Sequence, residues 1–279
     1  MTTLFVRQLT VIDCSYLDDQ LGLVGESWYV DVELDGELNE QGMLFDFSHV
    51  KKTLKKLIDS TVDHALLVPE SAPSYQLIQE CEDQLSLRFQ SQVGTFIHKS
   101  PHCAVQRLAV ERISAETVAY WLEQSARAVL PPNVQSVRFF LHAEKLPSEQ
   151  AYYHYSHGLK KHEGNCQRIA HGHRSQIEIL TAGQRNTALE TQWAKQLKNG
   201  YIGTVEDIKA EDDHSLTFAY QANQGHFEIT VPKSICTLMP TDTTVELIAR
   251  FICEQINQPN TRVRAYEGIE KGAIAKSEP

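Results

Sequence analysis

The sequence is poor in the features that assign a chain to a membrane or to nucleic acid. No apolar run reaches the length that crosses a bilayer, and the first residues lack the basic and then apolar order of a signal peptide. These absences predict a cytoplasmic protein without a membrane partner. Basic residues are also scarce, since 26 Lys and Arg stand against 36 Asp and Glu. The net charge of −10 leaves no basic stripe to neutralise phosphates, which argues against a nucleic-acid partner.

Paired cysteines are absent as well. The six cysteines are scattered, without a CxxC pair, at positions 14, 81, 103, 166, 236 and 253. In a reducing compartment such cysteines are free thiols, and most of them are expected to be buried as small hydrophobic residues. The hydrophobic residues make up 42% of a chain of 279, which suffices for the core of one large domain or of two ordinary ones.

Hydrophobic periodicity predicts one series of strands and helices twice over. In the first half, strands are predicted over 4–12, 28–34 and 134–141, with helices from Asp46 and over 114–128. In the second half, strands are predicted over 151–157, 175–180 and 262–266, with a helix over 244–256. The fold class is therefore α+β, with two copies of one unit over 1–147 and 148–279. The second copy is expected to be degenerate in helix content, because residues 215–231 alternate as strands where the first has a helix.

Three stretches of the two halves can be aligned, although their identity is weak. They pair 42–47 with 200–205, 116–119 with 246–249, and 137–140 with 263–266. The alignment supports a duplication of the unit.

The densest chemical signal is a group of histidines in the second half. His171 and His173 are two residues apart at the start of a predicted strand, so both side chains point to one face. His157, on the preceding strand, can meet them across an antiparallel ladder. Three imidazole ligands with an open fourth position are typical of a catalytic zinc site. The alternative is a solvated loop, because five histidines crowd residues 154–173.

The surroundings of these histidines resemble the 6-pyruvoyltetrahydropterin synthase and 6-carboxytetrahydropterin synthase family. The matching stretches are Tyr155-Ser156-His157-Gly158-Leu159, Gly164-Asn165-Cys166, His171-Gly172-His173, Gly42-Met43, Asp46-Phe47, Asp63-His64 and Glu267. The resemblance implies a tandem tunnelling fold, in which each unit has a four-stranded antiparallel sheet backed by two helices. It also implies a ring-shaped homo-oligomer. With two units per chain, the ring should hold an even number of units, most simply four from two chains.

The resemblance further implies zinc ligands, a proton-abstracting base, an assisting acid–base pair and contacts to a pterin ring. The zinc ligands would be His157, His171 and His173, and the base would be Cys166. The acid–base pair would be Asp63 and His64. The pterin ring would contact Glu267, with Thr244 and Glu246 as secondary candidates. Plainer interpretations are an inert thiol for Cys166, a helix end for Asp63 and His64, and a turn for Glu267.

Neither half carries the complete set. In the first half, Ser15 stands near the position of the first zinc histidine, and Val24-Gly25-Glu26 stands at that of the other two. In the second half, residues 232–236 offer no Asp-His pair. Because the losses are complementary, we expect one composite active site with parts from both halves. The alternative is decay of both copies to a binding module.

The implied substrate is 7,8-dihydroneopterin triphosphate. We favour a zinc-dependent lyase that forms 6-carboxy-5,6,7,8-tetrahydropterin, which leads towards the 7-deazaguanine of queuosine. The alternatives are formation of 6-pyruvoyltetrahydropterin, binding of a pterin or purine without catalysis, and a zinc hydrolase that releases formate from GTP. Retention of a cysteine at position 166 argues against the branch of the family that has glutamate there. The sequence leaves open the product, and whether the composite site lies within one chain or between two.

Overall fold

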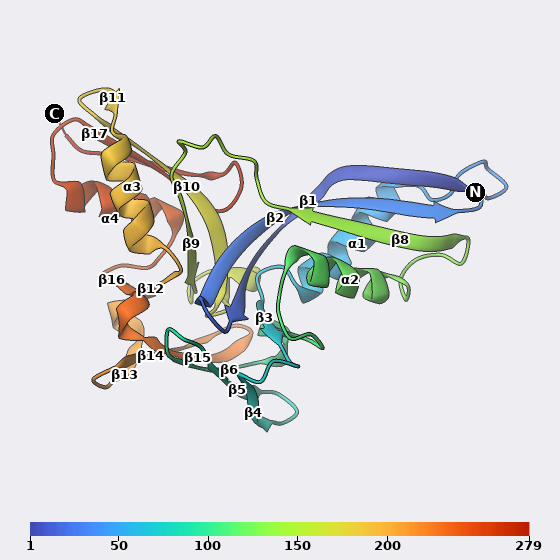
Figure 1. Ribbon diagram of the computed structural model, residues 1–279, viewed down its shortest axis with the longest axis horizontal. Helices are drawn as coiled ribbons and strands as arrows, with labels where there is room; N and C mark the ends of the chain where they lie inside the picture. Colours follow the sequence, from blue (N-terminus) through green and yellow to red (C-terminus); the bar gives the residue numbers. More distant parts are fainter. Residues whose placement is uncertain (279) are drawn as a thin grey trace.

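The computed structural model describes residues 1–278, which form three β-sheets and four α-helices. Two of the sheets extend in opposite directions from the middle of the molecule, and the third lies beside their junction (Figure 1). Pro279, the last residue of the predicted second unit, lies outside the described residues. Within residues 1–278, none of the helices has the length and apolar character needed to span a bilayer.

The first unit is a mixed sheet of five strands in the order β7-β3-β1-β2-β8. Its elements are β1 (Thr2–Asp18), β2 (Gly22–Gly36), α1 (Phe47–Thr61), β3 (Leu66–Pro69), β7 (Val105–Leu108), α2 (Ala115–Ala126) and β8 (Val134–His142). Strands β1, β2 and β8 pair antiparallel, whereas β1, β3 and β7 pair parallel. The buried residues of both helices join those of β1, β2 and β8 in one core, so the helices cover one face of this sheet.

The second unit repeats this plan in a sheet with the order β16-β12-β9-β10-β17-β18. Its elements are β9 (Tyr152–His157), η2 (Gly164–Gln167), β10 (His171–Thr181), β11 (Gln184–Arg185), α3 (Thr187–Leu197), β12 (Gly200–Thr204), β16 (Cys236–Met239), α4 (Val245–Ile256), β17 (Thr261–Tyr266) and β18 (Gly272–Lys276). Apart from η2, β11 and β18, the elements follow those of the first unit one for one. The structure therefore supports the duplication.

Each unit carries an insertion of three strands at the same place, before β7 and before β16. The insertions contain β4 (Tyr75–Glu80), β5 (Leu85–Gln90), β6 (Thr95–Ser100) and η1 (His102–Ala104), and η3 (Val205–Asp207), β13 (Ile208–Glu211), β14 (Ser215–Ala222), β15 (Gly225–Pro232) and η4 (Lys233–Ile235). They join through β6 and β15 into one antiparallel sheet of six strands, the shared sheet. The pairing is centred on His98 opposite Ile229 and is reciprocal on either side, as expected for two copies related by a two-fold axis.

The helices begin where the sequence provides caps. Asp46 accepts hydrogen bonds from the first backbone amides of α1, and Ser114 forms a capping box at the start of α2. The buried stripe of α1 is Val50, Leu54 and Ile58. Phe47, the first residue of α1, is exposed although it is hydrophobic.

Three expectations for the fold are wrong. The second unit is not degenerate in helix content, because α3 occupies the position of α1, and residues 215–231 are strands of the insertion. Residues 42–47 lie in a turn and the start of α1, whereas 200–205 form β12, so these stretches are not equivalent. Neither sheet is a four-stranded antiparallel one, since each includes two parallel strands near one edge. The stretches 116–119 and 246–249 do fall in corresponding helices, α2 and α4.

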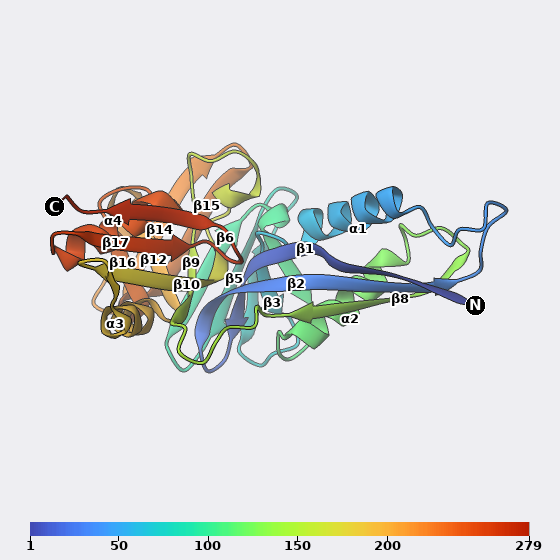
Figure 2. The same ribbon diagram turned by 90° about the horizontal axis from the view of Figure 1, so that it is seen from above.

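The two units meet backbone to backbone where the β1–β2 hairpin crosses β9 and β10 (Figure 2). A Cβ atom on Gly25 would lie 1.8 Å from the carbonyl oxygen of Tyr155, and one on Gly172 would lie 2.7 Å from the Cα of Gly25. Next to this contact, the hydroxyls of Ser15 and Ser156 are 2.6 Å apart. Only glycine permits this approach. This close approach places the β1–β2 hairpin of the first unit against β9 and β10, the strands that carry the histidines.

Candidate active site

Three imidazoles converge at the paired ends of β9 and β10. His157 lies directly opposite His171 in the antiparallel register, and His173 follows two residues later on the same face. One ring nitrogen from each lies within 4.8 Å of the others. All three side chains are fully buried. The prediction that these residues meet across the ladder is confirmed by the geometry, and the solvated-loop alternative is wrong.

The hydrogen bonds of this cluster leave at least one nitrogen of each imidazole without a partner among the described residues. The Nδ1 atoms of His157 and His171 donate to the carbonyl oxygens of Thr243 and Arg168, both at 2.9 Å. Their Nε2 atoms have no hydrogen-bond partner among residues 1–278, and neither ring nitrogen of His173 has one. Burial lowers the pKa of His157 and of His171 well below the usual value, so both are neutral. Buried polar atoms without partners are costly, and three imidazoles with free Nε2 atoms suit Zn²⁺.

A carboxylate from the first unit supports the third imidazole. Asp13 of β1 is buried, and its Oδ1 lies 3.2 Å from Nδ1 of His173. Asp13 accepts hydrogen bonds from Ser27 Oγ at 2.5 Å and from Lys271 Nζ at 3.0 Å. Burial alone would raise the pKa of Asp13, but the neighbouring His173, Lys271 and Ser27 together lower it far below the usual value. Asp13 is therefore an anion beside a candidate metal ligand, as carboxylates that orient such ligands are.

The predicted acid–base pair approaches the cluster from the loop after α1. His64 Nδ1 is 2.8 Å from Asp63 Oδ2, and the His64 ring centroid lies 5.1 Å from that of His171. Burial opposes protonation of His64, but hydrogen bonds and charge from Asp63 and Cys166 outweigh it and raise its pKa to about 10. His64 also has φ of 52°, in the left-handed region that non-glycine residues rarely adopt. Such backbone strain is typical of functional positions.

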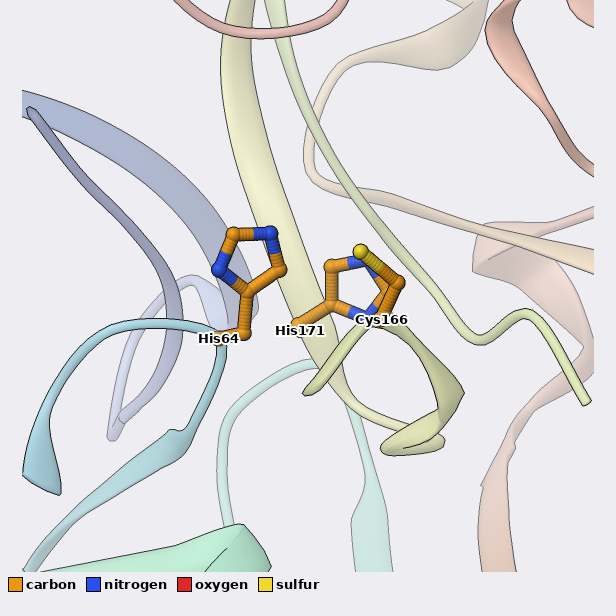
Figure 3. Close-up of side chains that lie close together, drawn as sticks. All are labelled: His64, Cys166 and His171. Carbon is orange, nitrogen blue, oxygen red and sulfur yellow. The ribbon is translucent and has the colours of Figure 1, made fainter. Parts of the chain in front are cut away.

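Cys166, on η2, completes the group, and Figure 3 shows its sulfur beside the rings of His64 and His171. Ligand atoms of these three residues also lie within 4.8 Å of one another, which makes them a second possible metal set. That set is the poorer one, because His64 is bound to Asp63 and carries a proton at neutral pH. Cys166 is then not required as a metal ligand.

The three residues expected to contact a pterin lie at different distances from the histidine cluster and have different surroundings. Glu267 follows β17, and its Oε1 lies 3.9 Å from Nε2 of His173, so it borders the cluster. Thr244 caps α4 by accepting from the Leu247 amide. Glu246 is exposed and lines a different pocket, with Arg250 and Cys253. The structure thus brings Glu267 to the candidate site and leaves Glu246 away from it.

Strand register identifies the corresponding positions in the first unit. Ser15 pairs with Gly25 as Ser156 pairs with Gly172. Three other residues therefore stand where the second unit has its histidines: Tyr16, Val24 and Glu26. The expectation that Ser15 takes the first of these positions is off by one residue, whereas the other two are as expected. These side chains do not form a zinc set.

The loop after α3 is the counterpart of the loop that carries the acid–base pair. Strands β3 and β12 pair with β1 and β9 in the same register, which aligns Lys198 with Asp63 and Asn199 with His64. Asn199 shares the left-handed conformation of His64, with φ of 52°. The second unit thus keeps the backbone conformation of this loop but lacks the acid–base side chains.

Sequence reasoning missed two residues of the site. Asp13 had no signal of its own, because nothing local relates a lone aspartate on β1 to a histidine 160 residues later. Thr243 is the neighbour of a predicted residue, and its backbone carbonyl, a group that leaves no trace in the sequence, accepts from His157. The assembled site offers a metal position, a thiol, a protonated imidazole and a carboxylate around one point, which suits proton abstraction next to a polarised oxygen.

Comparison with known proteins gives a family model that matches the chain twice. The model is described as 6-pyruvoyl tetrahydropterin synthase, and it matches residues 21–145 and 147–278. Two relatives carry the provisional name 6-carboxy-5,6,7,8-tetrahydropterin synthase. The one from Pyrococcus abyssi is 29% identical over 119 residues, which is 42% of this chain and 65% of that protein. The one from Pyrococcus horikoshii is 29% identical over 114 residues, 41% of this chain and 64% of that protein. The chain thus spans just under two thirds of each relative.

Solved structures resemble the chain more distantly. The 6-pyruvoyltetrahydropterin synthase of Plasmodium vivax has 19% identity and a TM-score of 0.39, covering 49% of this chain and 85% of that one. The enzyme of the same name from Plasmodium falciparum has 17% identity and a TM-score of 0.34, covering 43% of this chain and 74% of that one.

Proposed function

Because the chain belongs to the 6-pyruvoyl tetrahydropterin synthase family, we propose that it is a zinc-dependent lyase with one composite active site. Its substrate is 7,8-dihydroneopterin triphosphate, and its product is 6-carboxy-5,6,7,8-tetrahydropterin, a precursor on the way to queuosine. The first unit, residues 1–147, supplies Asp63 and His64. The second unit, residues 148–279, supplies the metal ligands, Cys166 and Glu267.

One observation carries the proposal, namely the contact between parts that each unit lacks. The His64 ring of the first unit lies 5.1 Å from the His171 ring of the second, and Cys166 lies beside both. If both copies had lost their function independently, complementary groups would not be expected to stay in contact. The contact also forms within one chain, which favours an intrachain site over one shared between chains.

Each residue has a role that its surroundings support. Zn²⁺ bound to His157, His171 and His173 would act as a Lewis acid that polarises the side-chain oxygens of the substrate. Cys166, as thiolate, takes the proton from the side-chain carbon whose acidity is thereby increased. His64, protonated and oriented by Asp63, exchanges the proton of the adjacent oxygen. Glu267 accepts hydrogen bonds from the N–H groups of the pterin ring.

Thr244 and Glu246 have at most indirect roles in this proposal. Thr244 fixes the start of α4, directly after Thr243, whose carbonyl accepts from His157. Glu246 faces another pocket.

A product assay tests the proposal. The zinc-loaded protein is incubated with 7,8-dihydroneopterin triphosphate, and products are identified by mass spectrometry. We expect 6-carboxytetrahydropterin with release of acetaldehyde and triphosphate, and loss of turnover in Cys166→Ala with zinc retained. Full activity of Cys166→Ala, or a purified protein that binds no zinc, would contradict the proposal.

The same assay separates the alternatives. The description of the family model favours 6-pyruvoyltetrahydropterin as the second candidate product, which would form without acetaldehyde. Binding of substrate without turnover would identify a non-catalytic pterin-binding protein, and release of formate from GTP would identify a hydrolase.

A further inference from the structure

None of the residues assigned to the site lies in the shared sheet, yet one turn of this sheet contacts the loop that carries Cys166. Gln224 lies in the turn between β14 and β15. Its side-chain Nε2 donates to Asn165 Oδ1 at 3.0 Å, and its backbone N–H donates to Gln167 Oε1 at 2.6 Å. These two partners flank Cys166 in the sequence, so the turn holds the loop on both sides of the thiol.

The same glutamine reaches the acid–base pair through a buried cation. Gln224 Oε1 accepts from Nε of Arg168 at 3.2 Å. Arg168 is 4% exposed, and its guanidinium donates to the backbone carbonyls of Asp63 and His64, each at 3.3 Å. A buried guanidinium is stable only when its donors are satisfied, so these bonds fix its position. Gln224 therefore connects the Cys166 loop to the loop of the first unit that carries His64.

Two tyrosines and an asparagine strengthen the attachment. Tyr220 of β14 donates to the carbonyl of Gln167 at 2.8 Å, and Tyr201 of β12 donates to the carbonyl of Ile169 at 3.1 Å. Asn165 Nδ2 donates to the carbonyl of Asp59 at 2.9 Å, in the last turn of α1. The loop thus touches the shared sheet, the second unit and the first unit at once.

We propose that the β14–β15 turn is a clamp, with Gln224 as the positioning residue that holds Cys166 between His64 and His171. Gln224 touches neither the metal position nor the reacting atoms and acts through Asn165, Gln167 and Arg168. The kinetic consequence rests on the proposed lyase function, whereas the effect on the loop does not. Since a displacement of about 1 Å at a reacting group can cost about 100-fold in rate, a loose loop should lower turnover.

The test compares Gln224→Ala with Gln221→Ala, a matched control. Gln221 lies near the end of β14, just before the turn, and among residues 1–278 its side chain donates only to the adjacent Ala222 carbonyl, at 3.3 Å. Four quantities are measured on the full-length zinc-loaded protein: amide hydrogen exchange of residues 164–168, the rate of Cys166 alkylation by iodoacetamide with Cys81 as reference thiol, zinc content, and kcat with KM.

For Gln224→Ala we expect faster exchange, faster alkylation of Cys166 and unchanged zinc content. The value of kcat should fall about 10- to 100-fold while KM stays within about threefold, because binding is kept and positioning is lost. Gln224→Glu keeps the acceptor for Arg168 and loses the donor to Asn165, so its kcat should lie between those of the wild type and Gln224→Ala. Gln221→Ala should match the wild type throughout.

Unchanged exchange and unchanged Cys166 alkylation in Gln224→Ala would overturn the clamp, as would equal changes in Gln221→Ala. If the wild type shows no turnover, the proposed function fails, and exchange and alkylation alone decide on the clamp. If Gln224→Ala does not fold, Gln224→Glu takes its place and must show the same loosening of residues 164–168.

Discussion

At the scale of single residues, the two units differ by an exchange of chemistry at equivalent positions. Asp13 of the first unit faces His173 of the second at 3.2 Å. At the two positions equivalent to these, Glu26 of the first unit lies 3.8 Å from His154 of the second. Both acids are buried. Burial raises the pKa of Glu26 to about 7, whereas the pKa of Asp13 is lowered. The carboxylate that stays charged is the one beside the candidate metal ligand.

We predict that Asp13→Asn weakens zinc binding by about 10- to 100-fold, because the outer carboxylate that orients His173 and increases its basicity is neutralised. Competition with a chromophoric chelator measures the affinity. Glu26→Gln, which removes the equivalent acid at a place where residues 1–278 form no metal set, should bind zinc as tightly as the wild type. Equal affinities of Asp13→Asn and the wild type would contradict the role given to Asp13.

We also predict that His64→Gln lowers kcat by about 100- to 10,000-fold, since a positioned acid–base group contributes on this order. Zinc content should stay unchanged, because His64 is not among the proposed ligands. His49→Gln, which alters an exposed histidine of the neighbouring helix, serves as the control and should keep full activity. Loss of zinc from His64→Gln would instead favour the set of His64, Cys166 and His171.

At the scale of elements, the shared sheet depends on the pairing of β6 with β15. His98 lies at the centre of this pairing, fully buried, with Nε2 2.9 Å from Ser100 Oγ. Burial lowers the pKa of His98 to about 3. Because the unfolded chain takes up a proton near pH 6.5 and the folded chain does not, stability is complete above that pH. It is lost progressively as the pH falls from about 6.5 towards 3.

We predict that His98→Leu reduces the acid sensitivity of folding. At pH 5 protonation of this histidine in the unfolded state costs about 2 kcal/mol of stability relative to neutral pH. Urea unfolding at pH 7 and at pH 5 measures the free energy of unfolding. Its decrease between the two pH values should be smaller by about that amount in the variant. His214→Leu, which alters an exposed histidine between β13 and β14, should keep the wild-type dependence. Identical pH dependence in all three proteins would disprove the assignment to His98.

At the scale of the whole molecule, the parts of the proposed composite site meet without a second chain. The sequence alone allowed a site between chains, in which Asp63 and His64 of one chain would meet the metal ligands of another. The contact of His64 with His171 removes that requirement. A ring of two chains with four units remains a prediction for the assembly, and a mass of about twice 31.6 kDa by light scattering would support it.

We predict that mixing His64→Ala chains with His171→Ala chains restores no activity. Each chain would build a site that lacks one of the two residues, because both come from the same chain. The mixture, refolded together to allow exchange of subunits, is assayed against each variant alone. Activity clearly above the average of the two variants would show that sites form between chains.

The sequence by itself determined the groups whose relation is local. The spacing of His171 and His173 fixes a common face on one strand, and the caps at Asp46 and Ser114 fix the helix starts, because both depend only on neighbouring backbone. The complementary losses also predicted one composite site. The tertiary structure decided the rest: the approach of Asp13 to His173, the chemistry around His64, and the pairing of β6 with β15. These contacts join residues more than 100 positions apart, and they follow from the close packing of Gly25 against Gly172 and from sheet pairing, which no local pattern encodes.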